Sequence, residues 1–142
     1  MIYGKTNWTS TTPINTTNLN KIEDGIYQAN KINNYSTNEQ VIGTWVDGKP
    51  LYRKVLSTGT LPNNGILTIP YNVDNLKRIL KVSGIAYGGT YGLLLPASNS
   101  ISSSVINVYI NYGVKAIEIQ TYSDRTSYTE GYITIEYTKT TD

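Results

Sequence analysis

The sequence predicts a mainly β protein: an antiparallel β-sandwich, jelly-roll-like, preceded by a short N-terminal α-helix that forms a trimeric coiled coil. Two observations lead to this fold class. Residues 1–38 contain one helical spacing of apolar side chains, whereas residues 39–142 alternate apolar and polar side chains in period two. We therefore expect an N-terminal arm with an oligomerisation helix over residues 1–38 and a β-sandwich head domain over residues 39–142.

The helix is expected over about residues 16–33, because Pro13 is tolerated just before a helix and Asn15 or Thr16 can cap its first turn. The seam of this helix has the spacing of a coiled coil and continues into one polar residue: Leu19, Ile22, Ile26, Ala29 and Asn33. So short a helix is marginal alone in water, and its seam must be buried on the β domain or on further copies of the helix. Because isoleucine-rich seams favour three strands, we expect a homotrimer.

The β domain opens with a predicted hairpin. Residues 41–46 and 51–56 are prone to form strands, and Asp47-Gly48 between them is a strong hairpin signal. Trp45 and Tyr52 flank this turn, so we expect them to pair across the hairpin, with ligand stacking as the alternative.

Further strands are predicted at 66–70, 76–86, 92–95, 105–112, 115–122 and 132–138. In the last three, isoleucine and valine alternate with polar residues, which predicts one buried and one wet face for each strand. About eight short strands joined by turns indicate an antiparallel sandwich.

Composition excludes several functions. The net charge is +2 with 15% charged residues, and Lys77, Arg78 and Lys81 are interpreted as a solvated face, so no nucleic-acid partner is expected. The chain has no His and no Cys, which removes the commonest general base, the commonest metal ligand and thiol chemistry. Glu118 and Glu136 are expected to point outward at solvated sites, which does not fit the carboxylate pair of a glycosidase. We expect the protein to have no enzymatic activity and to bind no metal and no cofactor.

No apolar stretch approaches the roughly 18 residues that span a bilayer, so no membrane insertion is expected either. The candidate binding residues instead lie in or beside loops that are rich in Gly, Ser and Tyr: Tyr87, Tyr91, Asp124, Arg125 and Tyr128. Aromatic faces stack on sugar rings, and Asp or Arg bonds to hydroxyls, so this set predicts a carbohydrate site. Loop packing and trimer contacts are the alternative roles.

Three runs of the sequence carry a resemblance to a known class of protein. They are Trp8 with Thr12-Pro13-Ile14-Asn15, Asn18-Leu19-Asn20-Lys21-Ile22-Glu23 and Gly25-Ile26; the run from Tyr35 to Lys54, which contains Gly43-Thr44-Trp45-Val46-Asp47-Gly48-Lys49-Pro50; and the ending from Ile135 to Asp142. Together they resemble tail-fibre and receptor-binding proteins of tailed bacteriophages that infect low-GC Gram-positive and other gut bacteria.

The resemblance implies a trimeric fibre or spike on the virion surface, assembled in the host cytoplasm, with a β-sandwich head. We also expect the N-terminal arm to contact other virion proteins. The resemblance does not itself imply a receptor, and attachment of the particle to carbohydrate of the host cell wall is expected from the loop residues named above. The chain has no extended shaft, unlike long fibres. A purely structural role, as head decoration, baseplate component or fibre tip without its own ligand, is therefore the alternative.

Overall fold

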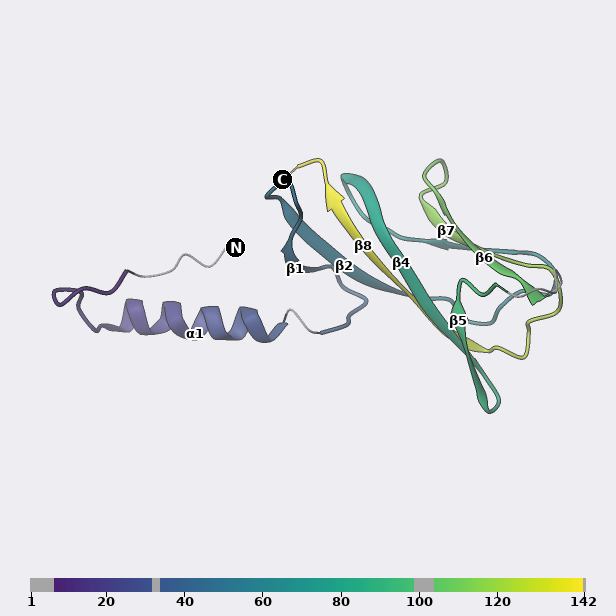
Figure 1. The fold of residues 1–142 in the computed structure, drawn as a ribbon, viewed down its shortest axis with the longest axis horizontal. Helices are drawn as coiled ribbons and strands as arrows, with labels where there is room; N and C mark the ends of the chain where they lie inside the picture. The colour runs from purple at the N-terminus through teal and green to yellow at the C-terminus, as the bar shows by residue number, and fades with distance from the viewer. Residues whose placement is uncertain (1–6, 32–33, 99–103, 142) are drawn as a thin grey trace. The chain divides into compact units, whose positions relative to one another are not determined.

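The computed structural model describes residues 7–31, 34–98 and 104–141, and the chain forms two compact units, Met1–Asn34 and Tyr35–Asp142 (Figure 1). The predicted boundary was between residues 38 and 39. In the structure the carbonyl of Ser36 accepts a hydrogen bond from the amide of Val55 at 2.9 Å. The segment just before the predicted boundary is therefore part of the β unit.

Helix α1 (Thr16–Lys31) begins where the sequence predicts. The side chain of Asn15 accepts a hydrogen bond from the amide of Asn18 at 2.9 Å, so Asn15 is the N-cap. Of the predicted seam, Leu19 and Ile26 are 50% and 53% exposed. Ala29 is also exposed and Ile22 is half-buried, while Asn33 lies outside the described residues. In the described part of the chain, no helix is both long enough and apolar enough to cross a membrane.

The β unit contains two antiparallel sheets. The five-stranded sheet has the order β1 (Gln40–Thr44), β2 (Pro50–Ser57), β8 (Glu130–Lys139), β4 (Leu76–Gly88) and β5 (Tyr91–Leu95). The three-stranded sheet has the order β3 (Ile66–Pro70), β7 (Ala116–Thr121) and β6 (Ile106–Asn111). Every strand predicted from the sequence is present, and its ends lie within two residues of the prediction. The protein is thus mainly β, with two antiparallel sheets consistent with a β-sandwich.

Side chains from the two sheets form one hydrophobic core. Its most buried members include Ile106, Ile117, Ile119, Ile133, Ile135 and Tyr137, each 0% exposed. The predicted alternation of β7 and β8 is therefore confirmed, because their isoleucines are buried. Burying one such side chain contributes about 1.5–3 kcal/mol to stability.

The predicted hairpin joins β1 to β2, but its turn is longer than a two-residue loop. The amide of Gly48 donates to the carbonyl of Trp45 at 2.9 Å, and Gly48 has a φ of 81°, which glycine adopts readily. The amide of Trp45 bonds to the carbonyl of Lys49, whereas Tyr52 lies opposite Val41. The expected cross-strand pair of Trp45 and Tyr52 is therefore wrong.

The ring of Tyr52 stacks instead on Tyr137, with the ring centroids 5.7 Å apart. The hydroxyl of Tyr137 donates to Glu39 Oε2 at 2.6 Å, and Lys139 Nζ lies 2.6 Å from Glu39 Oε1. Burial, followed by the hydrogen bond to Glu39, raises the pKa of Tyr137. Glu39, directly before β1, is thereby tied to the end of β8.

Candidate functional site

The two loops that carry the predicted binding residues lie next to each other. The amide of Thr129 donates to the carbonyl of Tyr87 at 3.1 Å. A Cβ at Gly88 would lie 2.5 Å from the carbonyl oxygen of Ser127 and 3.0 Å from the Cα of Tyr128. This close approach requires glycine at position 88 and holds the β4–β5 hairpin against the loop at residues 122–129.

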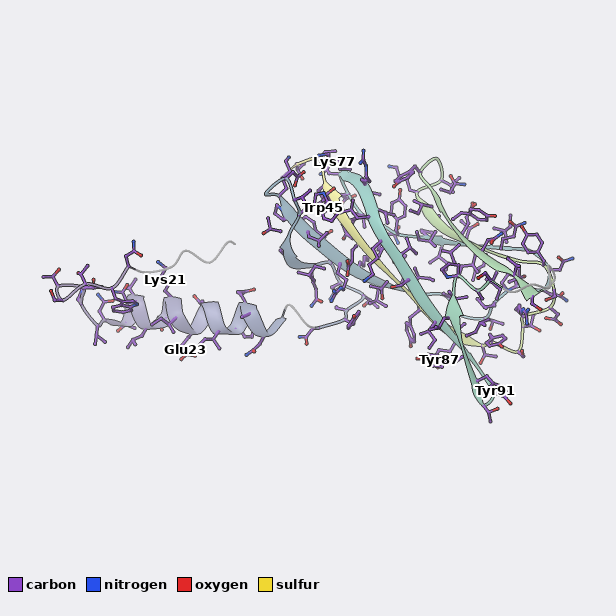
Figure 2. The ribbon with its side chains drawn as sticks, viewed as in Figure 1. Lys21, Glu23, Trp45, Lys77, Tyr87 and Tyr91 are labelled. Atoms are coloured by element: carbon purple, nitrogen blue, oxygen red, sulfur yellow. The ribbon has the colours of Figure 1, made fainter. Side chains whose placement is uncertain are left out.

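Tyr87 and Tyr91 are the two predicted aromatic site residues that are exposed to solvent. Tyr87 is 44% exposed and Tyr91 is 76% exposed, and Figure 2 shows both at the β4–β5 hairpin. An exposed tyrosine ring has an apolar face for stacking and a hydroxyl for hydrogen bonding. These two side chains are therefore suitable for contact with a sugar.

The other three predicted residues help to build their own loop. Asp124 is exposed, but its Oδ1 accepts hydrogen bonds from the amide and the hydroxyl of Thr126, at 2.9 and 2.7 Å, and these bonds lower the pKa of Asp124. The Nε atom of Arg125 is buried, with no hydrogen-bond partner among the described residues. Tyr128 is half-buried and packs against the core. Their geometry agrees with loop packing, the alternative role.

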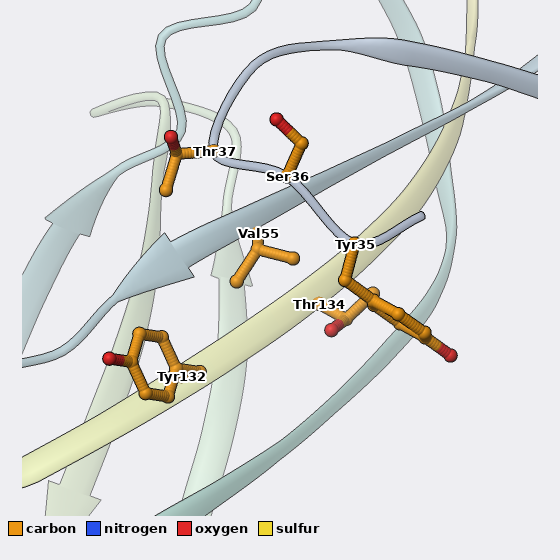
Figure 3. A pocket seen from close by; sticks show the side chains of 6 residues that line it. All are labelled: Tyr35, Ser36, Thr37, Val55, Tyr132 and Thr134. Carbon is orange, nitrogen blue, oxygen red and sulfur yellow. The ribbon is translucent and has the colours of Figure 1, made fainter. Parts of the chain in front are cut away.

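The structure also contains a hollow that the sequence did not predict. It has a volume of about 360 Å³, and we call it the outer hollow; its lining is Tyr35, Ser36, Thr37, Val55, Tyr132 and Thr134. Figure 3 shows the segment with Tyr35 and Thr37 beside Val55 of β2 and Tyr132 and Thr134 of β8. The period-two pattern of β8 already placed Tyr132 and Thr134 on its wet face. Nothing local in the sequence indicated that Ser36 bonds to Val55.

The outer hollow lies on the face of the five-stranded sheet that points away from the core, here called the outer face. Ile133 and Ile135 point into the core, so the alternating side chains of β8 point outward. Strand register places one outward row across four strands, which we call the outer row: Ser57, Tyr132, Ile85 and Leu94. Leu94 is 71% exposed and Tyr132 is 38% exposed.

A hydrogen bond holds the hydroxyl of Tyr132 within the outer face. This hydroxyl donates to Glu130 Oε1 at 2.7 Å. The bond to Glu130, together with its negative charge, raises the pKa of Tyr132, because ionising the tyrosine would break the bond and place two anions together.

A row of charged side chains borders the outer face. Arg53 Nη2 and Lys81 Nζ lie 3.0 and 3.9 Å from Glu136 Oε1, and the Arg53 guanidinium lies 4.7 Å from the centre of the Tyr35 ring. The Glu136 side chain is only 15% exposed. The expectation that Glu136 is solvated is therefore wrong, because its pairing with Arg53 shields it.

Glu118, the second carboxylate considered, is half-buried on β7 and accepts a hydrogen bond from Asn111 Nδ2 at 3.0 Å. It too is not a freely solvated group, and it lies in the other sheet from Glu136. Lys77, Arg78 and Lys81 are exposed, so the interpretation of these basic residues as a solvated face is confirmed.

Among residues 7–31, 34–98 and 104–141, no group of three or more His, Cys, Asp or Glu is placed to hold a metal ion. The two surfaces just described can therefore supply aromatic stacking, hydroxyl hydrogen bonds and apolar contact. Comparisons of the chain with protein-family models, with curated proteins and with solved structures find no match.

Proposed function

We propose that this protein is a trimeric component of a phage fibre or spike, which attaches the virion to carbohydrate on the bacterial surface. The observation that carries the proposal is the exposed apolar seam of α1 on a chain whose β unit presents exposed tyrosines at one hairpin. The nested pairing of β2 with β8 and of β3 with β7 supports the jelly-roll-like arrangement of the head. The N-terminal arm is proposed to contact other virion proteins.

The seam supports self-association on energetic grounds. Leu19 and Ile26 are about half exposed within the helix. Burying a leucine or isoleucine fully contributes about 1.5–3 kcal/mol, and a trimer buries three copies of each. Branched aliphatic side chains at these seam positions favour three strands. Light scattering of the purified protein tests this part, with a mass three times that of the chain as the expected result.

The tyrosines support carbohydrate binding on chemical grounds. Tyr87 and Tyr91 expose ring faces that can stack on a sugar and hydroxyls that can bond to it. One sugar contact is weak, so three copies on one particle strengthen attachment through avidity.

The binding experiment measures retention of the protein on immobilised cell-wall polysaccharides from low-GC Gram-positive bacteria. Exchange of both Tyr87 and Tyr91 for Ala is expected to weaken binding about tenfold, from roughly 0.5–1.5 kcal/mol per aromatic contact. Tyr109→Ala is the matched control, since Tyr109 is an exposed tyrosine (46%) on β6 of the other sheet. Equal binding by the double variant and the control would contradict the site.

The alternative is a purely structural virion component without its own ligand. It is favoured by the loop contacts of Asp124, Arg125 and Tyr128, which occupy part of the predicted site. A protein that forms trimers but binds none of the polysaccharides would support this alternative.

A further inference from the structure

The outward faces of the two sheets arrange their apolar side chains differently. On the three-stranded sheet, Ile66 of β3 and Tyr109 of β6 are exposed but lie opposite the polar residues Gln120 and Glu118 of β7. In the outer row of the five-stranded sheet, Tyr132, Ile85 and Leu94 are register neighbours on three adjacent strands. An antiparallel sheet that faces water is normally polar on its wet side, and contiguous exposed apolar side chains mark a surface that becomes covered.

Chain connectivity relates this face to the helix. Four residue steps separate Lys31, the end of α1, from Tyr35, which lines the outer hollow. An extended chain spans at most about 3.6 Å per residue, so these steps reach no further than roughly 14 Å. The axes of packed helices lie about 8–10 Å apart. In a bundle of three parallel helices, the three Tyr35 segments would therefore begin close to the axis of the bundle.

We propose that the outer face is covered by a second copy of this chain, with the Leu94 side of one copy against the outer hollow of the next. This inference rests on the trimer of the proposed function. A closed ring of three requires a heterologous contact, in which two different patches meet. The outer face has two such patches, because Leu94 lies on the edge strand β5 and the outer hollow lies over β2 and β8.

The border of the face fits an interface rim. Arg53 and Glu136 are already paired within one chain, and Lys81 lies beside them. A partner that covers this border therefore buries an ion pair whose charges offset each other. Burying a single unpaired charge would be strongly unfavourable. Protein interfaces commonly have such an apolar centre with a polar rim.

The absence of Cys from the sequence allows a direct test, since each single-cysteine variant has one thiol. Leu94→Cys reports the outer face, and Ile66→Cys is the matched control, an exposed aliphatic residue (58%) on β3 of the other sheet. The rate of maleimide labelling is measured at a concentration where light scattering gives the trimer. We expect Leu94→Cys to react roughly tenfold or more slowly than Ile66→Cys, because protection reflects the rarity of opening.

Two further variants secure the interpretation. Ile26→Asp places a charge in the helix seam, and in combination with Leu94→Cys it is expected to give monomers with fast labelling. Ser57→Cys adds little volume in the same outer row and is expected to be protected as well, so it serves if Leu94→Cys itself weakens the trimer.

Each outcome bears on a different claim. A trimer in which Leu94→Cys and Ser57→Cys label as fast as Ile66→Cys overturns the inference and leaves the proposed trimer standing. A monomer overturns both. A monomer in which Leu94→Cys is still protected identifies the occupant as the chain's own helix.

Discussion

Tyr137 provides a sharp test of how the ends of the β unit are held together. Its ring is 0% exposed and its hydroxyl donates to Glu39 at 2.6 Å. Tyr137→Phe keeps the ring and removes this bond. Hydrogen bonds to charged groups contribute about 1.5–3 kcal/mol. Because the Glu39 side chain is 33% exposed, we expect the lower end of that range, a loss of about 1.5 kcal/mol at pH 7.

The same substitution has a pH dependence of known sign. Burial raises the pKa of Tyr137 above its ordinary value of 10.0. Above pH 10 the unfolded chain loses this proton and the folded chain keeps it, so the unfolded state binds fewer protons and stability falls as pH rises. The free energy of unfolding then falls by an amount that approaches about 1.4 kcal/mol per pH unit. The Phe variant lacks this ionisable group, so the greater stability of the parent protein should disappear near pH 11.

The assay is urea unfolding followed by circular dichroism from pH 7 to about pH 11. Glu39→Gln is the control, because it retains an acceptor oxygen and the buried Tyr137, and it should therefore retain the alkaline loss. A difference between the parent and Tyr137→Phe that stays constant over this range would refute the reasoning.

Two glycines allow further predictions from melting temperatures. Gly48→Ala should destabilise the protein by about 1–2 kcal/mol, because Gly48 has a φ of 81°. Gly43→Ala is the control and should have little effect, since both sites have open space for a Cβ and only Gly48 has a positive φ. Equal melting temperatures for the two variants would contradict this account. Gly88→Ala should destabilise by about 1–3 kcal/mol through its clash with Ser127, and an unchanged melting temperature would mean that the loop moves aside freely.

The sequence predicted those parts of the fold that depend on neighbouring residues. Asn15 caps α1, and the strands end within two residues of the predicted positions, because caps and period-two alternation are local signals. The division into sheets was beyond such reasoning. For example, β3 pairs with β7 across about fifty residues of chain, and no local pattern indicates that pairing.

The candidate site was predictable only in part, for the same reason. The loops with Tyr87 and Asp124 were predicted to contribute to one carbohydrate site, and they do adjoin. The outer hollow was missed because it forms only when the segment at Tyr35 lies along β2. Glu136 was placed in solvent because alternation gives the direction of a side chain but not its neighbours, and here Arg53 and Lys81 cover it.

The contact between Glu39 and Lys139 has a practical consequence. Their side chains lie 2.6 Å apart, although they stand just before the first strand and at the end of the last. The first strand thus begins close to where the last strand ends, as in domains that tolerate insertion into another protein. A surface loop of an unrelated carrier, opened at one position, can therefore receive residues 35–141, with the longer linker at residue 35, because the segment before Glu39 runs along β2 to Val55. Such a chimera would display the outer face and the tyrosine hairpin without α1.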